Sequence, residues 1–481
     1  MTYELQTINP RQYDGAMLFL YGDEGASRAL PLSKREVACV NERRERGRDF
    51  IMTFDRLPHR LYVLSFDSEL PAPEVQEGLR RSAMKLLRLL EADGVESLAV
   101  TGDGALPEEV MAAVEGITLA DYSFDRYKSK APWHLQHVVV DDSFVRADEL
   151  EASQRLWNRI FWCREWVNLP VQDLNAERFA EELQSIANDL ADVSCTVMDK
   201  RKIESLRMGG LMAVNRGSVD EPRFVVLEYK PAEAAASRPI CLVGKGVMYD
   251  TGGLNIKPED YMQEMKSDMA GAATMASVLF AAAENRIPLH LVALLPMTDN
   301  RPGFNAYAAD DILTMYDGTT VEVVNTDAEG RLILADAIAY AARNLDPALI
   351  IDAATLTGAA VRAISTYGIA AMQQGAANEL TMLKLVGEQV YERLVEFPMW
   401  KEYDELIKSD FADLRNCGST PQAGTITAGK FLAHFAGKVP YIHLDIAGVA
   451  YFTKEQHCYR AGASAYGMRL LYAFLQMQDM I

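Results

Sequence analysis

The chain has 481 residues, too many for one ordinary hydrophobic core, so its length predicts two or three domains. Hydrophobic residues make up 49% of it and charged residues 24%, a composition that excludes disorder as the default state. The formal net charge of −20 disfavours binding to nucleic acid and to acidic membrane surfaces. The most basic segment, residues 33–50, alternates arginine with glutamate and is typical of a solvated helix face.

Cysteine spacing and the start of the chain predict a cytoplasmic protein. The six cysteines lie far apart and form no CxxC pair, which favours reduced thiols over a disulfide framework. The first residues show no basic start followed by a long apolar run, so we expect no signal peptide. No uninterrupted apolar stretch reaches membrane-spanning length.

Residues 1–147 predict a small N-terminal α/β domain. Short apolar runs bounded by turn residues indicate strands at 16–22, 60–66, 97–103 and 135–140. Helical periodicity indicates a helix over 73–94, with Gly94 as its C-cap, and a second helix over 107–117.

The sequence pattern over residues 148–167 predicts one long helix that connects this domain to the rest of the chain. Its apolar residues, including Leu156 and Ile160, recur at helical spacing, and charged residues fill much of the remainder. A single helix between two α/β domains is suited to connecting them as a rod.

The pattern over residues 168–481 predicts a larger C-terminal α/β domain. Strand candidates alternate with Ala-rich helices such as 271–286 and 330–344, which indicates a mainly parallel sheet flanked by helices on both faces. The candidates lie at 224–229, 240–244, 289–297, 321–327, 348–356 and 441–448.

The stretch NTDAEGRL, residues 325–332, follows the candidate strand 321–327 and leads into a helix that begins near Gly330. Residues two apart in an extended segment share a face, so we expect Asp327 and Glu329 to point into one pocket. Two carboxylates at close range repel each other, and a bound divalent cation removes that conflict. Ligands in open α/β sheets also bind at the carboxyl ends of strands.

Two further segments add charged residues that could join this pocket. Residues 243–258 carry Lys245, Asp250 and Lys257 among several glycines, and residues 264–273 place Asp268 near the start of an apolar helix. Each segment alone is a weak signal. The glycine-rich loop lacks the order of a P-loop, an isolated Asp268 would be interpreted as a helix N-cap, and a lone lysine is usually solvated.

Taken together, these segments resemble the leucyl (cytosol) aminopeptidase family, whose members hydrolyse peptides from the amino end with two metal ions. The hallmark is NTDAEGRLILAD at 325–336, and the other family segments lie before or after it in the expected order. They are VGKGVMYDTGG at 243–253, MKSDMAGAA at 265–273, AATLTGA at 353–359, GTITAGKFL at 424–432 and HLDIAGVA at 443–450. The resemblance covers the domain from about residue 168 onward and implies that residues 168–481 form a catalytic metallopeptidase domain, whereas the N-terminal domain carries no such motif.

The resemblance implies two metal sites that share ligands. One ion would be held by Lys245, Asp250, Asp268 and Glu329, and the other by Asp250, Asp327 and Glu329, with the Asp327 carbonyl added. Asp250 and Glu329 would therefore bridge the ions. Lys245 would have to bind as a neutral amine, which burial beside two cations favours by depressing its pKa.

The resemblance also implies two catalytic positions outside the metal ligands, Lys257 and Arg331. Lys257 would stay charged and hold the oxyanion that forms on the substrate. Arg331 would hold a bicarbonate ion, assisted by backbone groups near Gly330 and Leu356, and this anion would move the proton. The seven histidines lie outside the metal-ligand segments. The alternative is that Arg331 pairs with a nearby acid.

Recognition of a free α-amino group would follow from one metal ion binding the amine and Asp268 orienting it. Met265 and Thr355 resemble residues that line the pocket for the first side chain of the substrate. A methionine there would accept Leu or Met side chains because its own side chain is adaptable. The alternative interpretation is that Met265 belongs to the hydrophobic core.

The implied cofactors are two divalent ions per subunit, Zn or Mn with Mg or Co as alternatives, because an oxygen-rich ligand set does not fix the metal. Bicarbonate is a further implied cofactor. The implied partners are peptide substrates and identical subunits in a homohexamer, without membrane or nucleic acid.

Two other functions are alternatives to the aminopeptidase. A dinuclear phosphoesterase usually recruits histidines to its metals, and these segments supply none. A non-catalytic hexameric scaffold or DNA-binding regulator is disfavoured by the intact ligand set and by the acidic charge.

Overall fold

The computed structural model describes residues 4–9, 13, 15–22, 32–56, 60–234 and 237–479. The chain forms two compact units, Met1–Phe161 with Phe452–Gly462, and Trp162–Tyr451 with Ala463–Ile481. The boundary near residue 161 falls inside helix α4 (Ala147–Asn168), the helix expected at 148–167. The division into 1–147, 148–167 and 168–481 stays a prediction.

The first unit is built on a sheet of six described strands, in which every neighbouring pair is parallel except the pair of β3 and β4. In spatial order the strands are β1 (Glu4–Ile8), β6 (His137–Asp141), β5 (Ser97–Asp103), β2 (Ala16–Tyr21), β4 (Arg60–Ser65) and β3 (Phe50–Asp55). The sequence pattern predicted β2, β4, β5 and β6 and missed β1 and β3.

Helices α2 and α3 of the first unit pack closely against each other. Gly116 permits this approach, since a Cβ there would lie 2.5 Å from the Cα of Arg80. Helix α2 ends at the predicted C-cap, Gly94, whose φ of 67° lies in the left-handed region that glycine adopts without strain. The helices of this unit are α1 (Lys34–Arg44), α2 (Ala72–Asp93) and α3 (Pro107–Asp121).

The second unit is built on a sheet of nine described strands that is mainly parallel. Strands β11, β9, β14 and β18 run parallel to one another, and β10 runs parallel to β11. In spatial order the strands are β16 (Leu394–Glu396), β15 (Ile369–Gln374), β18 (Tyr441–Asp445), β14 (Leu349–Ala354), β9 (Ile240–Gly244), β11 (Leu291–Asn300), β8 (Arg223–Tyr229) and β7 (Val193–Met198), with β10 (Gly246–Asp250) beside β11.

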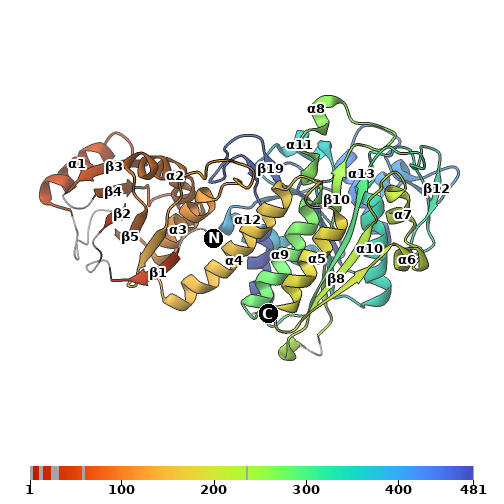
Figure 1. Ribbon diagram of the computed structural model, residues 1–481, viewed down its shortest axis with the longest axis horizontal. Helices are drawn as coiled ribbons and strands as arrows, with labels where there is room; N and C mark the ends of the chain where they lie inside the picture. Colours follow the sequence, from red (N-terminus) through yellow and green to blue (C-terminus); the bar gives the residue numbers. More distant parts are fainter. Residues whose placement is uncertain are drawn as a thin grey trace. The chain divides into compact units, whose positions relative to one another are not determined.

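Helices cover both faces of this sheet, as the alternating pattern predicted (Figure 1). One face carries α5 (Ala176–Asn188), α9 (Ala270–Glu284), α12 (Ala377–Val390) and α14 (Met468–Asp479). The other carries α7 (Gly209–Asn215), α10 (Gly330–Asn344), α11 (Gly358–Ile364) and α13 (Gly424–Ala436). All ten residues of β11 are buried, as expected for a strand covered on both sides.

Short elements connect these layers. They are α6 (Lys200–Ser205), α8 (Glu259–Met262), the 3₁₀ helices η2 (Ala232–Ala234), η3 (Met265–Met269) and η4 (Lys401–Ile407), a small sheet of β12 (Ile312–Thr314), β13 (Thr320–Glu322) and β17 (Leu414–Arg415), and the pair β19 (Tyr451–Phe452) and β20 (Gly462–Ala463).

The prediction of one long strand over 321–327 was wrong. The strand is β13, which ends at Glu322 and belongs to the small sheet. Beyond it, the side chain of Asn416 replaces a neighbouring strand: its Oδ1 accepts from the Val324 N–H at 2.7 Å, and its Nδ2 donates to the Asn325 carbonyl at 2.7 Å. The segment that carries Asp327 is therefore a turn fixed by a distant asparagine.

Candidate metal centre

The carboxyl ends of four parallel strands place polar residues at one edge of the second sheet. Lys245 directly follows β9, Asp250 ends β10, Asn300 ends β11 and Thr355 directly follows β14. Because parallel strands end at the same edge, residues far apart in sequence meet there. This is the edge at which the sequence predicted a ligand site.

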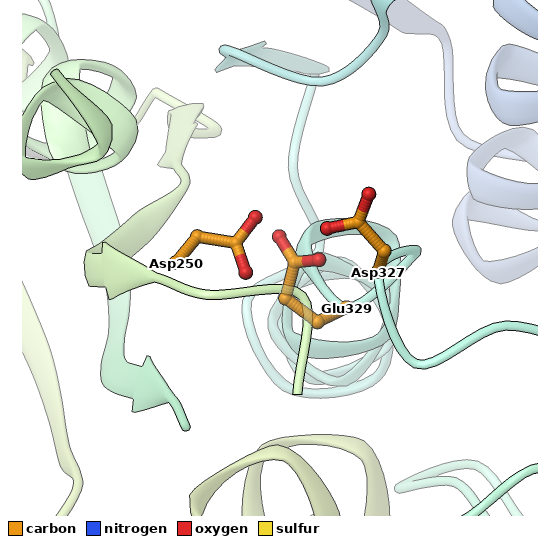
Figure 2. Close-up of side chains that lie close together, drawn as sticks. All are labelled: Asp250, Asp327 and Glu329. Atoms are coloured by element: carbon orange, nitrogen blue, oxygen red, sulfur yellow. The ribbon is translucent and has the colours of Figure 1, made fainter. Parts of the chain in front are cut away.

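Three carboxylates gather at this edge (Figure 2). Asp250, Asp327 and Glu329 each offer one oxygen, and these oxygens lie within 4.8 Å of one another. Asp250 and Glu329 are each 2% exposed. Glu329 has helical dihedral angles (φ −76°, ψ −39°) and stands at the N-cap of α10. The two acids of NTDAEG therefore meet through a turn that enters a helix, and not through the shared face of a strand that the spacing had suggested.

Lys245 joins Asp268 to this cluster. Its Nζ lies 2.7 Å from Oδ1 of Asp268, 3.0 Å from Oε1 of Glu329 and 2.8 Å from the carbonyl oxygen of Thr355. Gly330 makes room for the amine, because a Cβ at that position would lie 2.5 Å from the Lys245 Cε. Asp268 lies in η3, and the N-cap of α9 is Met269, so Asp268 is not the helix cap that its position alone suggested.

Lys257 lies between the two outer carboxylates. Its Nζ is 2.7 Å from Oδ2 of Asp250 and 2.5 Å from Oδ1 of Asp327. The Lys257 side chain is 14% exposed, whereas the Lys245 side chain is 3% exposed. The Lys257 ammonium group is therefore the one nearer to solvent. The structure thus brings together all five predicted metal ligands and the predicted catalytic lysine.

Burial and mutual charge set the pKa values in the cluster. Burial lowers the pKa of Lys245, but Asp268, Glu329 and Asp250 together raise it above its usual range. The pKa of Lys257 is raised in the same way, chiefly by Asp250. Burial raises the pKa of Asp268 and of Glu329. The two ammonium groups therefore balance carboxylates that burial would otherwise keep protonated.

Three buried carboxylate oxygens of the cluster have no hydrogen-bond partner among the described residues: Oδ2 of Asp268, Oε2 of Glu329 and Oδ1 of Asp327, the last of which has only its ion pair with Lys257. A buried polar atom without a partner is costly, about 1–3 kcal/mol, and needs an explanation. Hard divalent cations prefer oxygen ligands. The donor set therefore fits the divalent cations that the sequence predicted.

Arg331 lies in the first turn of α10, two residues after Glu329. It is 6% exposed, and its Nε has no hydrogen-bond partner in the described part of the chain. No described carboxylate lies within salt-bridge distance of its guanidinium group, so the pairing with a nearby acid is not seen. Burial lowers the pKa of Arg331. A buried guanidinium without a carboxylate partner suits an exogenous anion.

The remaining predicted residues surround these groups. Thr355 donates from Oγ1 to Oδ1 of Asp268 at 2.7 Å, so its side chain lies in the cluster. The backbone N–H of Leu356 donates to Oδ1 of Asp445 at 3.2 Å. Met265 begins η3 and is half-buried, three residues before Asp268.

Sequence reasoning missed two asparagines that support the cluster. Asn416 holds the backbone before Asp327, and Asn300 donates to Oδ1 of Asp250 at 2.8 Å. A polar residue at the end of an apolar strand was the available signal for Asn300. Asn416 lies 91 positions from the backbone it binds, and no local pattern points to it. No histidine belongs to the carboxylate cluster of the described chain, and His59 lies outside the described residues.

Fold and site together define a two-unit α/β protein with a buried carboxylate and lysine centre at the carboxyl edge of a mainly parallel sheet. The chain matches the cytosol aminopeptidase family, over residues 161–472 for the catalytic domain and 73–131 for the N-terminal domain. The chain belongs to this family and is a metal-dependent aminopeptidase, a hydrolase that acts on peptides. The phosphoesterase and the scaffold or DNA-binding regulator are not favoured.

Similar proteins cover nearly all of the chain. A "Probable cytosol aminopeptidase" of Chlorobaculum parvum is 46% identical over 497 aligned positions, which cover 98% of this chain and 95% of the relative. One of Geobacter sulfurreducens is 39% identical over 402 positions, covering 82% and 80%. The solved structure of the bottromycin maturation enzyme BotP in complex with Mn has a TM-score of 0.84 and 28% identity, covering 96% of this chain and 99% of that chain.

Within the described residues, no helix combines the length and the apolar character needed to cross a bilayer.

Proposed function

We propose that this aminopeptidase uses two divalent ions, held by Lys245, Asp250, Asp268, Asp327 and Glu329. The observation that carries the proposal is the pair of buried, unpartnered oxygens on Asp268 and Glu329 within a cluster of carboxylates. When bound in such a site, divalent ions supply a strong nucleophile from water at neutral pH and offset charge on a substrate oxygen. Mn and Zn are the proposed ions, and BotP, the similar solved structure, contains Mn.

Lys245 would change its state when the ions bind. Its ammonium charge now compensates Asp268, Glu329 and Asp250. Divalent charge among the same carboxylates would take over that compensation, and the buried lysine would then lose its proton and donate a lone pair. Lys257, closer to solvent, would remain charged, leave its carboxylate partners and hold the oxygen of the scissile carbonyl.

Arg331 is the proposed anion site, and bicarbonate is the proposed anion. A guanidinium binds a planar oxyanion through two parallel hydrogen bonds, and the described residues provide no carboxylate for that role. Gly330 and Leu356 would contribute backbone groups beside it. The anion would take a proton from the attacking water and return it to the leaving amine, the task that a histidine performs in many hydrolases.

Substrate choice is proposed to favour Leu-like first residues. Asp268 would accept a hydrogen bond from the free α-amino group, and Met265 and Thr355 would line the pocket for the first side chain. Met265 is half-buried and has an adaptable side chain, which suits Leu and Met.

A cytoplasmic homohexamer is the proposed physiological form. The wide cysteine spacing supports a reducing compartment, and the relatives carry the name cytosol aminopeptidase. The hexamer rests on family membership alone.

Metal removal and return test the central proposal. Purified protein would be dialysed against a chelator, then assayed on a leucyl chromogenic amide and on a phosphate ester after addition of Mn or Zn. We expect hydrolysis of the amide to vanish and to return with about two bound ions per chain. Full activity in the chelated, metal-free protein would refute the metal site.

A further inference from the structure

Asn300 connects the two segments that supply the carboxylate cluster. It ends β11 and is fully buried. Its Nδ2 donates one hydrogen to Oδ1 of Asp250 at 2.8 Å and the other to the carbonyl of Thr326 at 3.0 Å. One amide group therefore links the end of β10 to the residue that precedes Asp327.

The orientation of this amide is fixed by its partners. A carboxylate oxygen and a carbonyl oxygen both accept hydrogen bonds, so only the –NH₂ end can satisfy both. The other end is left buried: Oδ1 of Asn300 has no partner among the described residues. Such an atom is destabilising by about 1–3 kcal/mol. The unsatisfied Oδ1 is the consequence of the orientation in which both hydrogens of the Asn300 Nδ2 are donated to the cluster segments.

The surrounding backbone reinforces the same placement. The carbonyl of Asn300 accepts from the backbone N–H of Thr251 at 2.9 Å and from its Oγ1 at 2.8 Å. Gly253, with a φ of 65°, leaves room for the side chain, since a Cβ there would lie 2.8 Å from Oδ1 of Asn300. These contacts hold Asn300 against the residues on both sides of Gly252.

Asn300 also gives the two oxygens of Asp250 different roles. Oδ1 accepts from Asn300 and from the N–H of Gly252, each at 2.8 Å, whereas Oδ2 faces the Lys257 ammonium at 2.7 Å. Two neutral N–H groups therefore donate hydrogen bonds to Oδ1 and fix the plane of the Asp250 carboxylate. The other oxygen is directed towards the charged groups of the cluster.

We propose that Asn300 is the positioning residue of the metal centre, acting through Asp250 and Thr326 without contacting an ion. Asp250 and Asp327 repel each other, and the Asn300 amide holds their segments at the separation that divalent ions require. The inference rests on the proposed metal site and adds a determinant of metal affinity outside its ligands.

The test measures the affinity for Mn²⁺ directly, by calorimetric titration of chelated protein, beside thermal unfolding of the metal-free protein. Asn300→Leu removes both donors at similar size, Asn300→Ser shortens the side chain, and Asn300→Asp replaces the donors with a further acceptor. We expect Mn²⁺ binding to weaken about 10–100-fold in each, as for other partners of metal ligands. Excess Mn²⁺ should restore much of kcat, which it should not do for Glu329→Ala.

Asn215 provides a matched control. It is 3% exposed, and its Nδ2 also makes two donations, to the carbonyl of Asp220 at 2.7 Å and to Oγ1 of Thr298 at 3.1 Å. Asn215→Ser should lower the melting temperature and leave the Mn²⁺ dissociation constant unchanged.

The outcomes separate this inference from the proposed function. A folded Asn300→Ser or Asn300→Asp variant that binds Mn²⁺ within twofold of the wild type would overturn the positioning role. If the unaltered protein itself binds no Mn²⁺ or Zn²⁺, the proposed metal site is refuted, and the positioning role of Asn300 is refuted with it. Loss of stability in all three variants with unchanged affinity would assign Asn300 a structural role only.

Discussion

Both units of the chain place carboxylates at the ends of parallel strands, yet among the residues that the structure describes only the second unit forms a candidate metal centre. In the first unit, Asp141 ends β6 and is 6% exposed. Its Oδ1 accepts from the N–H of Ser143 at 3.0 Å and from its hydroxyl at 2.7 Å, and its Oδ2 accepts from Thr101. Every oxygen of that carboxylate has a partner within the protein.

In the second unit, Asp268 in η3 and Glu329 at the N-cap of α10 lie beside the strand-end carboxylate Asp250. Both are also buried, but each keeps one oxygen without a partner among the described residues. A buried carboxylate at a strand end is therefore no sign of a site by itself. The distinguishing feature is an acceptor that the protein leaves unsatisfied beside others of the same charge.

The largest expected effect comes from Glu329→Gln, which removes one charge at nearly constant shape. We expect kcat/KM for a leucyl amide to fall about a thousandfold, which corresponds to several kcal/mol of lost transition-state stabilisation. The metal-free variant should be at least as stable as the wild type because repulsion with Asp250 and Asp327 is relieved. Steady-state kinetics and thermal unfolding measure both effects.

The matched change in the first unit is Asp141→Asn, which should leave kcat/KM unchanged. Wild-type activity in Glu329→Gln, or an equal loss in Asp141→Asn, would remove the distinction between the two carboxylates.

Arg331→Ala should produce the next largest effect. We expect kcat to fall about a hundredfold, the usual contribution of proton transfer by a positioned group, while the Mn²⁺ affinity stays unchanged. Added bicarbonate should not restore activity because its binding group is gone. Arg331→Lys keeps the charge without the two-pronged geometry and should recover activity in part. Unchanged turnover in Arg331→Ala would refute the anion site.

Affinity for divalent ions should rise with pH. The pKa of Lys245 is raised by its carboxylate neighbours against the effect of burial, and burial raises the pKa of Glu329. A raised pKa means that the proton is held to higher pH and competes with the cation there. Each proton displaced should strengthen binding about tenfold per pH unit.

Calorimetry of Mn²⁺ binding between pH 6 and 8, in buffers of different ionisation enthalpy, counts those protons. A dissociation constant that does not change with pH would contradict the ligand role of Lys245.

The smallest effect belongs to an ordinary ion pair in the first unit. The Arg56 guanidinium lowers the pKa of Glu36 from 4.5 to about 2. Because the folded-state pKa is depressed, this stabilisation is present above the unfolded value and is lost as the pH falls from about 4.5 towards 2. Glu36→Gln should therefore destabilise the protein by less than about 1 kcal/mol at pH 7 and have no effect near pH 2.

Thermal unfolding of Glu36→Gln at pH 7 and at low pH checks this expectation. A loss of peptidase activity in this variant would show that the two units are functionally coupled.

The sequence alone determined the α/β class, the mainly parallel sheet, the family and the residues that gather at the site. These rest on local information. Periodicity fixes which face of a segment is buried, and the ligands stand in short motifs whose glycines, such as Gly330 beside Lys245, leave room for one arrangement.

Tertiary structure decided which carboxylate oxygens remain unsatisfied, that the strand ends at Glu322 and a turn follows it, and that Asn300 and Asn416 hold that turn and Asp250 in place. Hydrogen bonds from a side-chain amide to backbone far away in the chain leave no periodic trace in the sequence. They form only after the sheet has assembled, because the strand ends that carry their partners are brought together by that assembly.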